Sequence, residues 1–176
     1  MKNYRNNVFE TNSSSCHTIT LDTSAEYNNK LCVQKSDNKV HIELKYFERS
    51  YYKYTNVSDK LAYMILQASY IESISISVHH IEQWEFENKP TEEELEKRFL
   101  KNCSELYETK TFQKIVKAVQ KRYPCCKGIV IDYSYGSIDH ESVARCESIE
   151  EWLSDNDLNS IDDFLFGNYI LETDEG

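Results

Sequence analysis

The sequence predicts one α+β domain, in which a mixed, mainly antiparallel sheet packs with about four helices. The chain has 176 residues, the size of one ordinary domain, and 40% of them are hydrophobic. Short runs of alternating apolar residues are interspersed with longer runs in which apolar residues recur at helical spacing. Only four glycines and two prolines interrupt these runs, which leaves little room for long linkers. We therefore expect a single core over residues 1–176, with an acidic C-terminal part at 146–176.

Four short strands are predicted near the start of the chain. Residues 7–10 and 17–22 flank a polar loop, and the second of these runs alternates polar and apolar side chains. Residues 31–33 and 40–44 form a predicted hairpin across a Ser-Asp-Asn turn. Because apolar residues alternate in the later strand of this hairpin, His41 between them is expected on the solvent side.

Three longer helices and two short capped segments are predicted from N-cap signals and helical spacing. The three helices are expected at 58–70, from Thr91 to about 106, and from about 111 to just before Pro124. The two short segments begin at Ser148, before Trp152 and Leu153, and at Ser160, ending at 166. Ser58 is the expected N-cap of the first helix. Thr91 and Ser148 each stand three residues before a glutamate, which is the spacing of a capping box.

Further strands are predicted in the later part of the chain. Serine alternates with isoleucine and valine at 73–78, and residues 128–133 form the most apolar run of the sequence. A Tyr-Gly-Ser turn after the second run is expected to lead into a return strand at 138–142. Residues 169–171 are expected to close the sheet.

The negative charge of the protein is concentrated at its C-terminal end. The chain has a formal net charge of −10, and residues 1–145 contribute twenty acidic and twenty basic residues. The remaining ten acids therefore all lie in 146–176, where there is no base. Such a segment repels nucleic acid and attracts a basic partner, or it is simply a solvated face that keeps the protein soluble. We expect no strong binding to free nucleic acid, since phosphate contacts need cations.

The sequence also predicts the compartment. No run approaches the roughly 20 apolar residues of a membrane span, and a polar N-terminal segment stands where a signal peptide needs an apolar one. The six cysteines follow neither a disulfide framework nor the spacing of a zinc site, so free thiols are expected. We therefore expect a cytoplasmic protein without membrane contact and without a structural metal.

A polar loop near the N-terminus is the first candidate for chemistry. It contains one titratable imidazole, His17, and the following carboxylate, amide and hydroxyl groups: Glu10, Thr11, Asn12, Ser13, Ser14 and Ser15. An acid or base beside hydroxyl donors is the minimum needed to move a proton and to bind a phosphate or an oxyanion. The alternative is that the amide and the hydroxyls only cap their own turn.

A second cluster, Asp139-His140-Glu141-Ser142, lies in a segment with strand character. In an extended chain His140 and Ser142 point to one face and the two acids to the other. If His17 and His140 approach each other, they can act as the acid and the base in metal-free cleavage of a phosphodiester, with Glu10 or Asp139 orienting an imidazole. Alternatively, they can hold a divalent metal together with one of these carboxylates. Metal-independent chemistry is the favoured expectation.

Two motifs carry a resemblance to a known family. The opening VFETNSSSCHTITL resembles the N-terminal signature of a family of small proteins from bacteriophages and mobile elements, and YGSIDHES resembles a second signature of that family. The family usually has glutamine where this chain has Glu141. An anti-CRISPR inhibitor of type II effector nucleases is similar to these proteins. The resemblance implies a counter-defence protein that acts in the cytoplasm of a bacterial host cell.

The expected partner is a CRISPR effector nuclease with its guide RNA. The resemblance implies inhibition of this nuclease through a ribonuclease-like site that shortens the guide. One alternative is a non-catalytic inhibitor whose acidic part occupies a basic nucleic-acid channel, because such channels are lined with Lys and Arg. Another is a hydrolase or transferase that acts on a nucleotide or a protein side chain, with a loop serine or Cys16 as the nucleophile.

Overall fold

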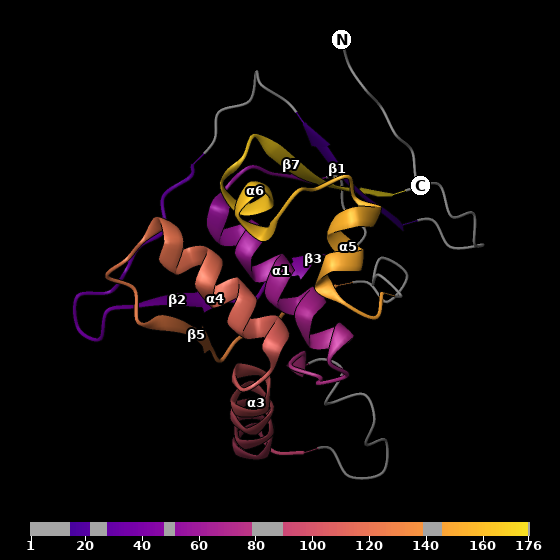
Figure 1. The fold of residues 1–176 in the computed structure, drawn as a ribbon. Helices are drawn as coiled ribbons and strands as arrows, with labels where there is room; N and C mark the ends of the chain where they lie inside the picture. Colours follow the sequence, from indigo (N-terminus) through magenta and orange to yellow (C-terminus); the bar gives the residue numbers. More distant parts are fainter. Residues whose placement is uncertain (1–14, 22–27, 48–51, 79–89, 139–145, 176) are drawn as a thin grey trace.

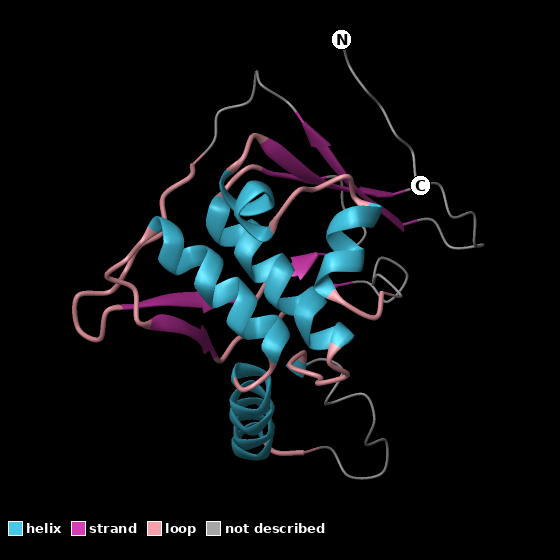
Figure 2. Cartoon of the chain, viewed as in Figure 1, coloured by secondary structure: helices cyan, strands magenta, loops and turns pink. Residues whose placement is uncertain are grey.

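The computed structural model describes residues 15–21, 28–47, 52–78, 90–138 and 146–175, with only the backbone for 15–18 and 173–175. The helices in these ranges are α1 (Val57–Ile71), α3 (Glu92–Tyr107), α4 (Lys110–Arg122), α5 (Ile149–Asp155) and α6 (Ile161–Phe166). The strands are β1 (Ser15–Leu21), β2 (Lys39–Glu43), β3 (Tyr46–Phe47), β4 (Tyr52–Tyr54), β5 (Gly128–Asp132), β6 (Ser137–Ile138) and β7 (Tyr169–Glu175). The chain is a mixed α+β domain, as its sequence predicts (Figure 2).

Helix α1 is the centre of the core. Eleven of its fifteen residues are buried, whereas a surface helix buries one stripe. Strands β2 and β6 and helices α4 and α6 contact α1, and Figure 1 shows it between the antiparallel strands and the β2–β5 pair. Elements from both sides of the core are therefore packed against this helix.

A buried lysine ties α1 to the C-terminal elements. Lys60 is fully buried, and its Nζ donates hydrogen bonds to the carbonyl oxygens of Gly167 at 3.1 Å and Tyr169 at 3.4 Å. Its Nζ also lies 5.9 Å from the ring centroid of Phe164. Burial lowers the pKa of Lys60 to about 8. This contact fixes the end of α6 and the start of β7 against α1.

The C-terminal strand β7 lies in the middle of an antiparallel sheet of order β1-β7-β4. Its residues pair with β1 from Tyr169↔Leu21 to Glu175↔Ser15, and with β4 at three positions. Two of its own residues, Ile170 and Leu171, are buried. Residues from both ends of the chain thus meet in one sheet.

Two short parallel pairs form a continuous ribbon. β2 pairs with β5 and, a few residues later, β3 pairs with β6 in the same direction. Between the pairs, Ser134 Oγ accepts a hydrogen bond from Leu44 N at 2.8 Å, and Ser137 N donates one to Lys45 O at 3.0 Å. The side chain of Ser134 thus continues the ladder where the segment between β5 and β6 is two residues longer than the segment between β2 and β3.

The local signals in the sequence locate the helices correctly. Thr91 and Glu94 form the predicted capping box of α3, and the predicted caps Ser148 and Ser160 accept hydrogen bonds from Glu151 N and Asp163 N. The expected cap Ser58 is wrong by two positions. Asn56 is the N-cap of α1, and its side chain accepts a hydrogen bond from Ser58 N at 2.8 Å.

The pairing of the strands differs from two expectations. The predicted hairpin survives only as one antiparallel bridge, Val33↔Val40, because β2 pairs with β5 instead. Residues 73–78 are not a strand: Ser73 has φ 56°, and the Ser75 carbonyl accepts a hydrogen bond from the Asn102 side chain. Ile76 and Val78 are nevertheless buried. The alternation of polar and apolar residues at 73–78 therefore arises because the apolar side chains contact the core, although this segment does not pair as a strand.

Several other expectations concern residues that the structure leaves undescribed. The predicted strand at 7–10 and most of the return strand at 138–142 lie outside the described residues. Within the described ranges, no helix is both long and apolar enough to cross a membrane. The strands of the described residues pair mainly in the antiparallel direction, as predicted. They form ten antiparallel residue pairs and seven parallel ones.

Substitution of Gly136 by alanine should destabilise the fold at the ribbon. A Cβ at this position would lie 2.5 Å from Leu44 Cβ and 2.6 Å from Lys45 N, so the two strands would have to separate. We expect urea denaturation to show a loss of about 1–3 kcal/mol in the free energy of unfolding. Gly128→Ala is the matched control, since a Cβ there meets nothing within 4 Å, and equal losses in the two variants would contradict the prediction.

Replacement of Lys60 by methionine should change the pH dependence of stability. Between the lowered pKa of about 8 and the ordinary value of 10.5, the unfolded chain binds a proton that the folded protein does not. The free energy of unfolding of the wild type, measured by urea denaturation, should therefore rise by about 2 kcal/mol relative to that of Lys60→Met between pH 7 and 9.5. The exposed Lys97→Met variant serves as the control, and an unchanged difference between wild type and Lys60→Met would disprove the prediction.

Candidate functional site

Most of the site residues predicted from sequence lie outside the described residues. These are Glu10, Thr11, Asn12, Ser13, Ser14, Asp139, His140 and Ser142. Ser15 and His17 belong to β1, where their backbones pair with Glu175 and Thr173 of β7. Their side chains are not described, so the proposed meeting of His17 and His140 remains a prediction.

The strand pairs nevertheless connect the backbones next to both clusters. Ile138, the residue before Asp139, pairs with Phe47 at the end of β3. Tyr52, at the start of β4, pairs with Thr173, which in turn pairs with His17. The rings of Phe47 and Tyr54 are in edge contact, with centroids 5.0 Å apart. One path through β3 and β4 therefore links the two segments.

This path limits how far apart the two clusters can be. Five residue steps from Phe47 to Tyr52 span at most about 18 Å. Three further strand spacings then place the Cα atoms of Ile138 and His17 within about 33 Å of each other.

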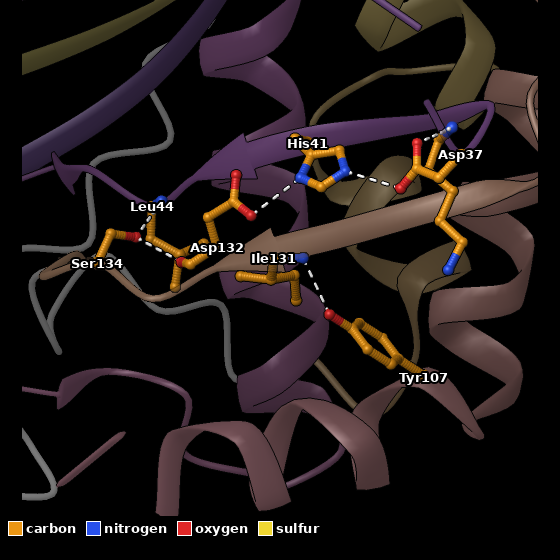
Figure 3. A network of polar contacts seen from close by, with 8 residues as sticks. Asp37, His41, Leu44, Tyr107, Ile131, Asp132 and Ser134 are labelled. Atoms are coloured by element: carbon orange, nitrogen blue, oxygen red, sulfur yellow. Dashed lines mark hydrogen bonds and ion pairs between the residues drawn. The ribbon is translucent and has the colours of Figure 1, made fainter. Parts of the chain in front are cut away.

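A histidine held between two carboxylates is the clearest polar network in the described part of the chain (Figure 3). His41 lies on β2, Asp37 precedes that strand, and Asp132 ends the neighbouring strand β5. His41 Nε2 lies 3.0 Å from an Asp37 carboxylate oxygen, and Nδ1 lies 3.0 Å from one of Asp132. The parallel register of β2 and β5 brings these groups together across 91 residues of sequence.

The two carboxylates favour the charged form of His41. Hydrogen bonds to Asp37 and Asp132 raise the pKa of His41, and the bond from His41 lowers the pKa of Asp37. When the carboxylates are ionised they only accept hydrogen bonds, so the form of the ring that satisfies both contacts at once is the imidazolium, with both nitrogens donating. The side chain of His41 is 31% exposed, so solvent screens these interactions in part.

This network is suited to holding charge more than to moving a proton. A general base needs an accessible nitrogen without a proton, and both nitrogens of His41 face carboxylate oxygens at 3.0 Å. Across the described ranges, no group of three or more His, Cys, Asp or Glu side chains is arranged to hold a metal ion. We therefore interpret the network as a clamp between β2 and β5.

Sequence reasoning placed His41 on the solvent side but did not find its partners. The outward position is correct, because Val40 and Ile42 on either side are buried. The spacing of Asp37 and His41 by four residues across a turn was an available signal. Asp132 was not detectable as a partner, because nothing local indicated that β2 and β5 pair.

The acidic C-terminal part is partly neutralised within the fold. Lys114 pairs with Glu150 of α5 at 2.6 Å, Lys121 with Asp162 of α6 at 3.7 Å, and Lys53 with Glu172 of β7 at 2.5 Å. The Lys114 hydrogen bond lowers the pKa of Glu150. Other acids of α5 and its flanks, Glu147, Glu151, Asp155 and Asp157, are exposed. A negatively charged face remains around α5.

Two of the described cysteines are unsuited to act as nucleophiles. Cys32, Cys103, Cys125, Cys126 and Cys146 are free thiols. Burial raises the pKa of Cys103 to about 12 and that of Cys146 to about 11, so both are protonated at neutral pH. Only the backbone of Cys16, the candidate nucleophile of the loop, is described.

Comparison of the chain with protein-family models, with curated proteins and with solved structures found no significant match.

The stabilising effect of the His41 clamp should depend on pH. The contribution from the raised pKa of His41 is fully present below about pH 6.5 and is lost as the pH rises through that pKa. Because the pKa of Asp37 is lowered, the contribution of this carboxylate to stability is present at every pH above its ordinary pKa of 3.8. It is therefore the same at pH 5.5 and at pH 9. The difference in urea midpoint between wild type and His41→Gln should therefore be larger at pH 5.5 than at pH 9. Asp132→Asn should behave in the same way, and a constant difference for both variants would refute the clamp.

Proposed function

We propose that the protein is a counter-defence protein of a phage or mobile element that inhibits a CRISPR effector nuclease by shortening its guide RNA. The observation that carries the proposal is the occurrence of both signature motifs, VFETNSSSCHTITL and YGSIDHES, in one chain. Each motif contains a strand of the described fold, β1 in the first motif and β6 in the second.

The proposed chemistry uses one imidazole as base and one as acid. One of His17 and His140 removes the proton of a ribose 2′-hydroxyl, which attacks the adjacent phosphorus. The other protonates the 5′-oxygen as the P–O bond breaks, leaving a 2′,3′-cyclic phosphate and a 5′-hydroxyl. The hydroxyl and amide groups of the two clusters bind the phosphate: Thr11, Asn12, Ser13, Ser14, Ser15 and Ser142. Glu10 or Asp139 orients an imidazole, and a divalent metal held by the same carboxylates is the alternative.

The charge distribution supports a dependence on the effector. A chain with a net charge of −10 gains little from free RNA, whereas the Lys- and Arg-lined channel of an effector attracts the negative face around α5. In this proposal the effector presents its guide RNA to the site in the bacterial cytoplasm.

The exposed acids around α5 favour one second function, a non-catalytic inhibitor that occupies the basic channel. Glu147→Gln combined with Asp155→Asn and Asp157→Asn would then abolish inhibition. His17→Ala and His140→Ala would leave it intact.

A single incubation tests the catalytic proposal. A type II effector loaded with end-labelled guide RNA is mixed with the protein, with and without a chelator, and the RNA is resolved on a denaturing gel. Wild type should shorten the guide only when the effector is present, and His17→Ala and His140→Ala should each reduce the rate at least 100-fold.

The control for this experiment is His41→Gln, which should retain the rate because both nitrogens of His41 are engaged in the β2–β5 clamp. Intact RNA with wild type in every arm would exclude the ribonuclease. Loss of cleavage with the chelator would replace the metal-free chemistry by the metal-dependent one.

A further inference from the structure

One end of the molecule gathers basic side chains in spite of the negative net charge. We name this surface the basic end and define it by six residues: Lys30, Lys35, Lys39, Lys121, Arg122 and Lys127. Five of them are exposed and Lys39 is partly exposed. Figure 1 shows the start of β2, the start of β5 and the end of α4 at the same edge of the molecule.

Hydrogen bonds hold the two contributing segments together. Lys127 N donates to Asn38 O at 2.7 Å, directly before the parallel pairing of Lys39 with Gly128. Tyr123 OH accepts a hydrogen bond from Leu31 N at 2.9 Å. The segment around Lys30–Lys39 is therefore fastened along the segment that follows α4.

The local charge is opposite to that of the whole chain. Residues 28–41 and 121–128 together contain six Lys and Arg and one acid, Asp37, which gives a formal charge of +5 against −10 for the chain. Lys121 pairs with Asp162 at 3.7 Å. Lys30, Lys35 and Lys127 form no ion pair with a carboxylate of the described residues. Lys30, Lys35 and Lys127 are therefore not neutralised by a carboxylate within the described residues.

Neutral polar side chains lie among these cations. Asn28, Gln34 and Ser36 are exposed on the same segment. Lys and Arg combined with amides and hydroxyls are the groups that proteins use to contact phosphate and sugar. A nucleic acid presents a negative charge at every nucleotide, so several separate cations can be paired by one strand at the same time.

We propose that the basic end binds the phosphodiester backbone of a nucleic acid without reading its sequence. The binding is weak in the isolated protein, with a Kd of about 10–100 μM at physiological salt, the range of non-specific binding. It is therefore compatible with the expectation of no strong binding to free nucleic acid. The inference uses no residue of the two motif clusters and does not depend on the proposed cleavage.

The test measures binding of the full chain to a fluorescent 20-nucleotide 2′-O-methyl RNA by anisotropy between 25 and 200 mM salt. This RNA lacks the 2′-hydroxyl nucleophile, so failure of the proposed ribonuclease does not affect the result. The variant carries Lys35→Gln, Lys39→Gln and Lys127→Gln. It should bind at least 10-fold more weakly at 50 mM salt, and the slope of log K against log salt should fall by about 2, for three lost contacts.

The matched control carries Lys97→Gln, Lys101→Gln and Lys110→Gln on α3 and α4, which changes the net charge equally. It should bind within twofold of wild type. Equal weakening by both triple variants, or no binding of wild type at 100 μM protein and 25 mM salt, overturns the proposal. Competition by polyglutamate as effective as that by unlabelled RNA overturns it in favour of an acidic polypeptide. If the first triple variant fails to fold, Lys30→Gln with Lys127→Gln is judged by the same criteria, with a slope change of about 1.4.

Discussion

The position of β7 between β1 and β4 is the constraint on which the rest of the structure depends. This strand buries Ile170 and Leu171, and its first residue accepts a hydrogen bond from the buried Lys60 of α1. The central helix, the antiparallel sheet and the strand that contains His17 are therefore held by one element. The acidic C-terminal part is thus structural as well as charged, and substitutions on β7 will disturb the N-terminal motif strand.

Local features of the sequence predicted the elements well. The capping box of Thr91 and Glu94 specifies its helix start through bonds between residues three positions apart, so no tertiary information was needed. The strand β5 was recognisable for a similar reason, because three consecutive apolar β-branched residues, Ile129, Val130 and Ile131, form a local signal. Asn56 was missed as a cap because Ser58 is an equally good cap by residue type.

Pairing between distant elements could not be predicted. The alternation at 73–78 describes which side chains face the core, but it does not provide a neighbouring strand, and the backbone there follows a turn at Ser73. The partner of His41 is likewise decided by the register of β2 and β5, 91 residues apart at Asp132. The basic end was missed for the same reason. Lys35 and Lys127 belong to segments that are individually unremarkable in charge, and only the pairing of β2 with β5 brings these segments together. The predicted site of His17 and His140 likewise requires two segments that are far apart in sequence to lie close together, which local patterns do not reveal.

The parallel ribbon also has a kinetic consequence. Lys39 pairs with Gly128, so forming β2–β5 closes a loop of nearly 90 residues that contains α1, α3 and α4. Helices form through local contacts in microseconds, whereas non-local strand pairing must first overcome loop-closure entropy. The helical middle of the chain should therefore assemble early, with ribbon closure as the slow step of folding. Until that step is complete the strand edges remain open, and this interval is when the protein is most exposed to aggregation.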